Sequence, residues 1–488
     1  MSVLQNIENN QEAPSRQVRK NQQRQLEKQL NHLQKLTKQK AAPVTFDNHT
    51  VTQFGLFGFL EAFKQVIGFS SIVENNLAIK RRHNATYSGP ELLETLVDSV
   101  CLGYFRFSHL DKLQKDHGYR KIKQADKIAD ESTIRYFMNQ FNTDTVRQLM
   151  AINRKLLARK FATETPREVW IDFDDTVITV FGEQENAAVG YNPRYHGRPS
   201  FKAKVAFIAG TGELVHCDLY DGKTNSNGHF LDFLKATLES LDPRRIIVKG
   251  IRVDRGFFDE KLFDYLDSQS IEYVCKAKMT ANVRKIAEYL EREQEFTAIS
   301  SNYATAEIRV PLPKWEKSRR FVIVRETLKP KEVQGQGCLE LTTYEYQGIV
   351  TSTDEGTAED IWHDYNQRAR IENKIDELKV GFGVDQMSQH DFISNQAYLL
   401  IKSLSYNLLN WFRLALFTEE DSRFEVSTVR RKVLNVPGNL VGSGAYRHLK
   451  LAPDKELEIR VTHMEKQLQT FLVWYTTTME EWTSQLAA

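Results

Sequence analysis

Acidic residues on a predicted strand are the first sign of chemistry in this chain. The run from Val169 to Phe181 alternates like a strand and contains Asp172, Asp174 and Asp175. Because side chains alternate with period two, Asp172 and Asp174 point to one face and Asp175 to the other. A strand this apolar elsewhere is expected to be central, and buried carboxylates are costly unless they are paired or bound to a cation. The pattern therefore suggests a metal site.

A further acid, Asp254, stands where a second predicted strand ends and a helix begins. In open α/β sheets, ligand sites gather at such strand ends. An Asp before a helix is also a common N-cap, so this residue alone supports two interpretations.

The strongest element is a predicted helix over residues 358–380. Thr357 to Asp360 has the pattern of a capping box, and Gly381 is a suitable stop. This helix carries an acid, two cations and a tyrosine: Tyr365, Arg368, Glu372 and Lys379. On a regular helix they lie in a stripe about 60° wide, and the first and last are about 21 Å apart along the axis. Such a stripe suits a metal ligand beside a phosphate backbone, and the alternative is a solvated ladder of salt bridges.

Together the acids predict a divalent-cation site. Two Asp and one Glu from a strand, a strand end and a helix can meet at one edge of a sheet. Mg²⁺ prefers oxygen ligands and keeps substrate phosphates, and two ions about 3.5–4 Å apart can activate a nucleophile and stabilise a leaving oxygen. The four cysteines form no C-x-x-C pair. We therefore expect neither a zinc site nor a disulfide framework, and a reducing cytoplasm fits.

The elements that must position these residues follow from periodicity. Further strands are predicted at 202–209, 215–219, 246–253 and 271–278, with helices at 227–241 and 258–268. Three sequential strands followed by alternating helices and strands describe an α/β fold, a mixed sheet with flanking helices. Residues 284–345 carry short strand-like pieces around a Lys/Pro/Gly-rich loop, and they predict a mainly β insertion. Residues 346–351 are expected to return to the sheet.

The flanking regions are helical or basic. Residues 1–42 form a basic polar arm with Leu26, Leu30, Leu33 and Leu36 at helical spacing, which is either an arm for DNA phosphates or a solvated tail. Residues 43–165 predict several helices, including 54–68, 90–102 and 132–160, and form either a DNA-binding bundle or a cap on the next domain. The catalytic core is predicted over 166–283 and 346–420, and 421–488 is a helical C-terminal region. The net charge is only +2, so any nucleic-acid surface must be local. The chain has no apolar run of membrane-spanning length.

The motifs resemble those of a known family. The order D-x-D-D-T, then D-R-G-F, then Y-x2-R-x3-E-x6-K is similar to the DDE transposases of bacterial insertion sequences, in particular the cut-and-paste group with a Y-R-E-K helix. Gly190-Tyr191-Asn192-Pro193 and Gly197-Arg198-Pro199-Ser200 resemble one subgroup of these enzymes. The resemblance runs from about Trp170 to Arg413.

This resemblance implies an RNase H-like catalytic fold, Mg²⁺ or Mn²⁺, and action on the terminal inverted repeats and target DNA by a homodimer. The first catalytic acid of the family is followed two residues later by Thr or Ser, which Asp174 and Thr176 match, while Asp172 is a second candidate. Asp254 and Glu372 match the other two acids. The residues implied in DNA binding are Tyr365, Arg368, Lys379, Trp362 and Arg255. Trp362 would stack on a displaced base or serve only in packing.

The expected function is therefore cut-and-paste DNA transposition. An RNase H-like nuclease or resolvase would share the three acids but has less need of the Tyr-Arg-Lys stripe. A domesticated derivative that only binds DNA would not need intact Asp174, Asp254 and Glu372.

Overall fold

The computed structural model describes residues 16–40, 50–328, 343–442 and 447–487. Residues 1–50 and residues 51–488 form two separate units, which are treated individually. In the first unit, α1 (Arg16–Lys40) contains the predicted amphipathic stretch, and Leu26, Leu30 and Leu33 are exposed. The parts of the predicted arm before residue 16 and after residue 40 lie outside the described residues, as does the Lys/Pro/Gly-rich loop. None of the described helices is both long and apolar enough to cross a membrane.

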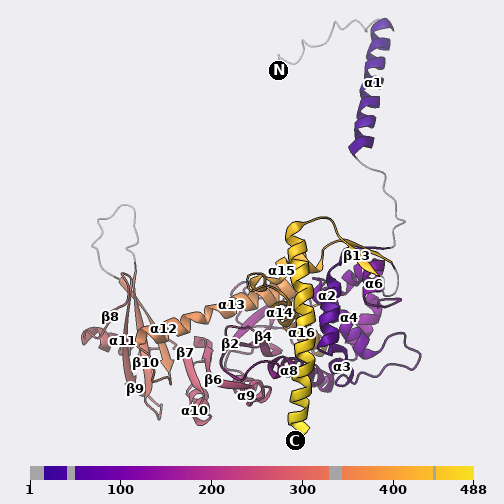
Figure 1. Ribbon diagram of the computed structural model, residues 1–488. Coiled ribbons are helices and arrows are strands. Elements are labelled where there is room, and N and C mark those ends of the chain that lie inside the picture. Colours follow the sequence, from indigo (N-terminus) through magenta and orange to yellow (C-terminus); the bar gives the residue numbers. More distant parts are fainter. Residues whose placement is uncertain (1–15, 41–49, 329–342, 443–446, 488) are drawn as a thin grey trace, which may run out of the picture. The chain divides into compact units, whose positions relative to one another are not determined.

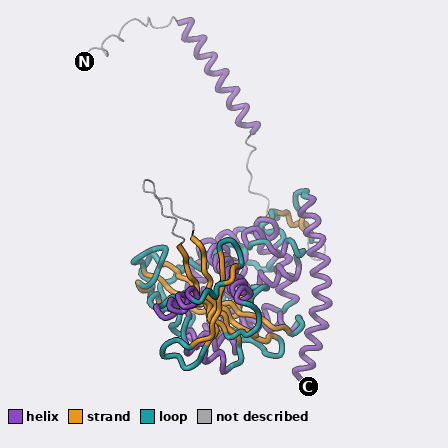
Figure 2. The backbone as a smooth tube through the Cα atoms, turned by 90° about the vertical axis from the view of Figure 1, so that its left-hand side faces the viewer, coloured by secondary structure: helices purple, strands orange, loops and turns teal. Residues whose placement is uncertain are grey.

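Ten strands of the second unit form one mixed sheet (Figures 1 and 2). The strands that carry or flank the acids are β2 (Arg167–Thr179), β4 (Pro199–Ile208), β5 (Leu214–Asp221), β6 (Ile246–Val253) and β7 (Glu272–Lys276). β4 pairs antiparallel with both β2 and β5, while β6 runs parallel to β2 and to β7. The order β5-β4-β2-β6-β7 is that of an RNase H-like fold, and it makes β2 central as its apolar sequence predicts.

The predicted insertion extends this sheet. β11 (Thr343–Thr351) pairs antiparallel with β7, and beyond it lie β10 (Arg319–Leu328), β9 (Tyr303–Val310) and β8 (Thr297–Ala298). The return of residues 346–351 to the sheet is thus confirmed. One helix, α11 (Ala281–Arg292), begins at a Thr280 cap and was not predicted within the insertion. A two-residue strand, β3 (Ala188–Val189), lies at the opposite edge against β4.

Helices cover both faces of the sheet. On one face α9 (Phe230–Glu239), α10 (Glu260–Ser268) and α11 share a core with β2 and β6. On the other lie α12 (Ala358–Gln367), α13 (Ala369–Asp376) and the long α14 (Phe392–Leu416). Figure 1 shows α12 and α13 running from the insertion strands toward α14.

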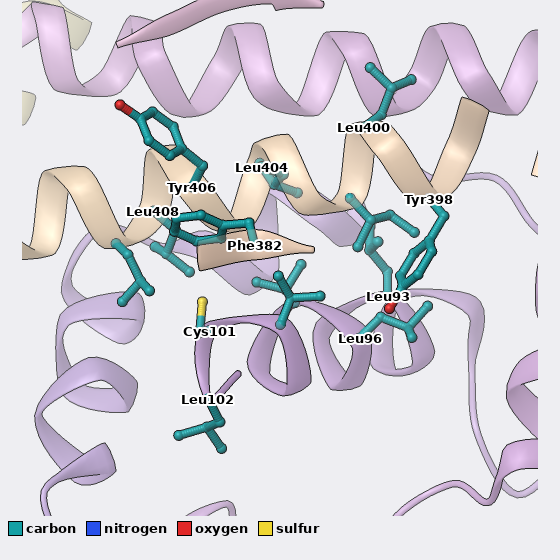
Figure 3. Close-up of a cluster of buried hydrophobic side chains, with 14 of the residues drawn as sticks. Leu93, Leu96, Cys101, Leu102, Phe382, Tyr398, Leu400, Leu404, Tyr406 and Leu408 are labelled. Atoms are coloured by element: carbon teal, nitrogen blue, oxygen red, sulfur yellow. The ribbon is translucent and has the colours of Figure 1, made fainter. Parts of the chain in front are cut away.

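The helices before β2 pack in the same core as α14. They are α2 (Phe57–Val66), α3 (Phe69–Glu74), α4 (Gly89–Cys101), α5 (Leu110–Lys115), α6 (His117–Ile122), α7 (Glu131–Met138) and α8 (Thr143–Ala162). In Figure 3, Leu93, Leu96 and Cys101 of α4 lie next to Tyr398 and Leu404 of α14. This is the packing expected of a cap on the catalytic core. The single helix predicted over 132–160 is wrong, because Asn142 caps a new helix with its side chain.

The chain after α14 closes the unit. Its elements are α15 (Val426–Val429), η5 (Arg430–Leu434), β12 (Gly438–Val441), β13 (His448–Lys450) and α16 (Lys455–Ala487). β12 lies between β13 and β1 (Val51–Thr52) in a small second sheet. α16 packs against α14 and α2, so both ends of this unit contribute to one core.

Candidate active site

Asp172 is held in a buried ion pair between neighbouring strands. The register of β2 and β6 places it opposite Arg252. Arg252 Nε lies 2.6 Å from Asp172 Oδ1, and Nη2 lies 3.1 Å from Oδ2. Arg252 also donates to the carbonyl oxygen of Asp364 on α12. Arg252 was not singled out from the sequence. An arginine two residues before Asp254 in an apolar strand, on the same face, is the signal that could have identified it.

Asp174 lies on the same face and meets a different arginine. Arg368 Nη2 is 2.9 Å from Asp174 Oδ2, and the backbone N–H of Asp175 donates to Oδ1 at 2.8 Å. Burial is the largest cause that raises the pKa of Asp174 to about 6. Arg368 opposes this shift, whereas the charges of Asp175 and Asp254 add to it. Asp254 is therefore close enough to Asp174 for its charge to disfavour ionisation of that carboxyl.

Asp254 directly follows β6 and precedes the short helix η2 (Arg255–Phe257). Its side chain makes no capping hydrogen bond to η2, so the N-cap interpretation does not describe it. Instead its Oδ1 accepts a hydrogen bond from the hydroxyl of Tyr365 at 3.3 Å. Burial is the largest cause that raises the pKa of Tyr365; the charge of Arg368 opposes this shift, and the charge and hydrogen bond of Asp254 add to it. The tyrosine therefore stays a hydrogen-bond donor to this carboxylate.

The helix that carries Tyr365 and Arg368 is not regular. α12 ends at Gln367, α13 begins at Ala369, and a π-helical turn, η3 (Glu377–Gly381), follows α13. π turns are rare and occur frequently at functional sites. The four residues of the predicted stripe differ in exposure: Arg368 is buried, Tyr365 and Lys379 are half-buried, and Glu372 is exposed. Arg368 lies at the break, 5% exposed and ion-paired with Asp174, so it is not part of a solvated salt-bridge ladder.

Glu372 does not join the two aspartates. It lies on α13, one turn after Arg368, and its side chain is exposed. Within the part of the chain that the structure describes, no group of three or more His, Cys, Asp or Glu side chains is arranged to hold a metal ion. The expected meeting of all three acids is therefore not observed: Arg368 is buried against Asp174, whereas Glu372, one turn later, is exposed. The role of Glu372 stays a prediction.

The pair Asp174 and Asp254 fits a divalent cation. Both offer carboxylate oxygens, which hard cations such as Mg²⁺ prefer. The raised pKa of Asp174 shows that this position disfavours uncompensated negative charge, and a bound cation would offset it. In this structure the guanidinium of Arg368 supplies the compensating charge.

The remaining predicted residues surround this pair at different depths. Lys379 is half-buried, and Trp362 packs against Tyr303 of β9 with ring centroids 5.0 Å apart. This contact is the packing role weighed for Trp362. Arg255 is exposed and lines a cavity of about 490 Å³ together with Lys276 and Arg284. Glu288 and Glu345 line the same cavity, so its charge is mixed.

Replacing Asp172 by Asn is expected to affect stability more than catalysis. The Asp172 and Arg252 side chains are only 5% and 7% exposed, so the change breaks a buried pair and should lower the free energy of unfolding by about 3 kcal/mol. Chemical denaturation measures this loss. Glu419→Gln is the control, because its partner Arg423 is exposed and such pairs contribute less than about 1 kcal/mol. An unchanged denaturation midpoint together with lost DNA cleavage would make Asp172 the first catalytic acid.

Comparison with known proteins places the chain in a protein family. A family model described as "Transposase DDE domain group 1" matches residues 34–471. A solved structure described as the piggyBac transposase synaptic complex with hairpin DNA is similar at 14% identity, with a TM-score of 0.40. The match covers 86% of this chain and 82% of that one. No curated protein sequence matches the chain.

Proposed function

Because the chain belongs to the DDE transposase domain family, group 1, we propose that it is a cut-and-paste transposase of the Y-R-E-K type. It would bind the ends of a bacterial insertion sequence, cleave them by two-metal-ion phosphodiester hydrolysis and join the 3′-hydroxyl ends to target DNA. The observation that carries this proposal is the arrangement of Asp174 and Asp254 with Arg368 and Tyr365 at one edge of an RNase H-like sheet.

Different residues of the chain would bind the metal ions, orient the metal-binding carboxylates and bind phosphate. Asp174 and Asp254, with Glu372 as the third acid, would hold Mg²⁺ or Mn²⁺. Such ions lower the pKa of the attacking water or hydroxyl and offset charge on the leaving oxygen. Arg368 orients Asp174 through its ion pair, and Tyr365 orients Asp254 through its hydrogen bond. When phosphate enters, Arg368 offers it a planar fork and Lys379 offers it a point charge.

The alternatives remain a nuclease or resolvase without strand transfer, and a derivative that only binds DNA. Excision of the element in cells distinguishes a cut-and-paste transposase from a derivative that only binds DNA. The gene with its flanking DNA would be placed on a plasmid, and the repaired donor site and new insertion sites would be sequenced. Wild type should give both products, and Asp254→Asn should give neither. Absence of both products with wild type would reject the proposal.

The N-terminal arm should contribute electrostatically to binding of the element's ends. Exposed cations of α1 would contact phosphates, and each lost contact makes the log–log dependence of affinity on salt shallower by about 0.9. The helices of residues 51–165 share a core with α14, so a fragment ending at residue 165 would expose apolar surface. The test therefore uses the full chain with Arg16, Lys20, Arg24 and Lys28 changed to Gln. An unchanged salt slope would leave α1 without a role in DNA binding.

A further inference from the structure

A surface of arginines and aromatic rings lies beside the candidate active site, at the end of the strand that carries Asp174. β2 ends at Thr179, and Phe181 follows it. The chain then forms a loop over residues 181–198, which contains the glycine-rich motifs singled out in the sequence and not used in the proposed mechanism. Five of its exposed side chains carry an aromatic ring or a guanidinium group, and we call these the rim surface: Phe181, Tyr191, Arg194, Tyr195 and Arg198.

The base of this loop is fixed by buried contacts. Asn192 is 3% exposed, donates to the Thr179 hydroxyl at 2.9 Å and accepts from the Tyr195 backbone N–H at 3.0 Å. Gly190 packs so closely on Gly222 that an added Cβ would lie 1.9 Å from its carbonyl oxygen. The rim surface is therefore presented on a well-anchored scaffold.

A second anchor ties the loop to the chain that follows the Y-R-E-K helix. The backbone N–H of Glu185 donates to His390, and the Glu185 carboxylate accepts from the backbone of Phe392. This carboxylate is thereby directed toward the start of α14.

The side chains on this scaffold point to solvent. Phe181 is 69% exposed, Tyr191 72% and Tyr195 40%. Arg198 lies over the ring of Phe181 and Arg194 over the ring of Tyr195. Exposed aromatic rings at an active-site edge cost solvation and contribute nothing to the core, which indicates a contact surface.

The charge of the rim surface is one-sided. No acid occurs in the sequence between Glu185 and Glu213, although Glu183 and Glu185 are exposed at the start of the same loop. Of the cations in that stretch Arg194 and Arg198 are exposed, whereas Lys202 and Lys204 are buried in β4 and Lys202 pairs with Asp175. Among the described residues, no carboxylate lies within salt-bridge distance of Arg194 or Arg198. The surface is joined to the site through β2, which carries Asp174 and ends at Thr179, the residue to which Asn192 of the loop donates.

We propose that the rim surface binds unpaired nucleotides of the DNA strand that leaves the cleavage site, with Arg194 and Arg198 on phosphates and Tyr191 and Tyr195 stacked on bases. Charge complementarity selects a polyanion. Exposed rings select unpaired bases, because a base within a duplex has no free face, and stacking on aromatic side chains is how single strands are bound. The inference deepens the proposed function and rests on it for the identity of the DNA.

The test is binding by the full-length protein in the presence of a chelator, so that no cleavage occurs. The probe is a fluorescein-labelled, mixed-sequence single strand of about 20 nucleotides, a length above the site sizes of single-strand binding folds, and its duplex. Arg194→Ala/Arg198→Ala should make the single-strand salt slope shallower by about 1.4, since each contact contributes about 0.7. The matched control is Arg244→Ala/Arg423→Ala, two exposed arginines, the first at the opposite end of β6 from Asp254. The control should keep the wild-type slope.

Stacking is tested separately. Tyr191→Leu should weaken single-strand binding about tenfold and leave duplex binding unchanged, whereas Tyr191→Phe should bind like wild type. Because all these side chains are exposed, the variants should unfold at the same temperature as wild type. A wild-type slope in the arginine variant, or equal single-strand affinity of the Leu and Phe variants, overturns the inference. If the protein does not transpose but the variants change the salt slope and the single-strand affinity as expected, the proposed function is rejected while the single-strand binding surface is retained.

Discussion

Asp254→Asn should reduce DNA cleavage by a factor of at least about 10²–10³, the usual cost of losing one electrostatic stabiliser of a transition state. Asn keeps the shape of Asp and can still accept the hydrogen bond from Tyr365, but it lacks the charge that a divalent cation needs. The same result is expected for Asp174→Asn. Single-turnover cleavage of a duplex carrying the gene's flanking sequence measures the effect, and a gel shift should show unchanged binding.

Stability separates this loss from damage to the fold. The charge of Asp254 raises the pKa of Asp174, so Asp254→Asn should not lower the free energy of unfolding. Glu372→Gln should also abolish cleavage if DNA or metal draws its exposed side chain to the aspartates. Asp376→Asn, one turn later on α13 and equally exposed, is its control and should cleave normally. Cleavage by Glu372→Gln at the rate of that control would remove Glu372 from the site.

Arg368→Ala should lose both cleavage and stability. Its guanidinium is the partner of Asp174, and breaking a buried pair by removing one member costs about 3 kcal/mol because the other charge stays buried. The same change in an exposed helical ladder would cost only about 0.3–0.5 kcal/mol and spare activity. Denaturation of the variant distinguishes the two values.

A double-mutant cycle assigns the loss to the pair. In an Asp174→Asn background the stability cost of Arg368→Ala should shrink by about 0.5–3 kcal/mol, the usual range for residues in contact. Lys379→Ala is the companion variant, because Lys379 is half-buried and makes no ion pair among the described residues. It should retain stability while cleavage falls. Additive stability effects of Arg368→Ala and Asp174→Asn would contradict the ion pair. Normal cleavage by both Arg368→Ala and Lys379→Ala would weaken the transposase assignment.

The strands were predictable because each has a local signal. β6 matches its predicted bounds, and β2 and β4 differ from theirs by a few residues, since apolar alternation ends where turn residues begin. What periodicity could not show is how distant strands pair. The antiparallel return of β11 beside β7, which merges the insertion with the catalytic sheet, depends on tertiary packing.

The candidate site was predictable in its residues and less so in its geometry. Asp174 and Asp254 contact Arg368 and Tyr365, residues that the motifs had assigned to phosphates, and the roles of all four stay predictions. Arg368 is buried and Glu372, one turn later, is exposed, a difference that a helical projection placing both on one stripe does not show. The pairing of Asp172 with Arg252 follows from strand register, which joins residues 80 positions apart.

Whether the chain is a transposase is best measured by strand transfer with the purified full-length protein, because a nuclease with the same acids would cleave DNA without joining it. A pre-cleaved duplex from the gene's flanking sequence, with a free 3′-hydroxyl, would be incubated with a plasmid target and Mg²⁺ or Mn²⁺. If the chain is a transposase, wild type should join the duplex covalently to the plasmid, and Asp254→Asn and a chelator should each prevent joining. Cleavage of intact ends by wild type without any joined product would contradict it.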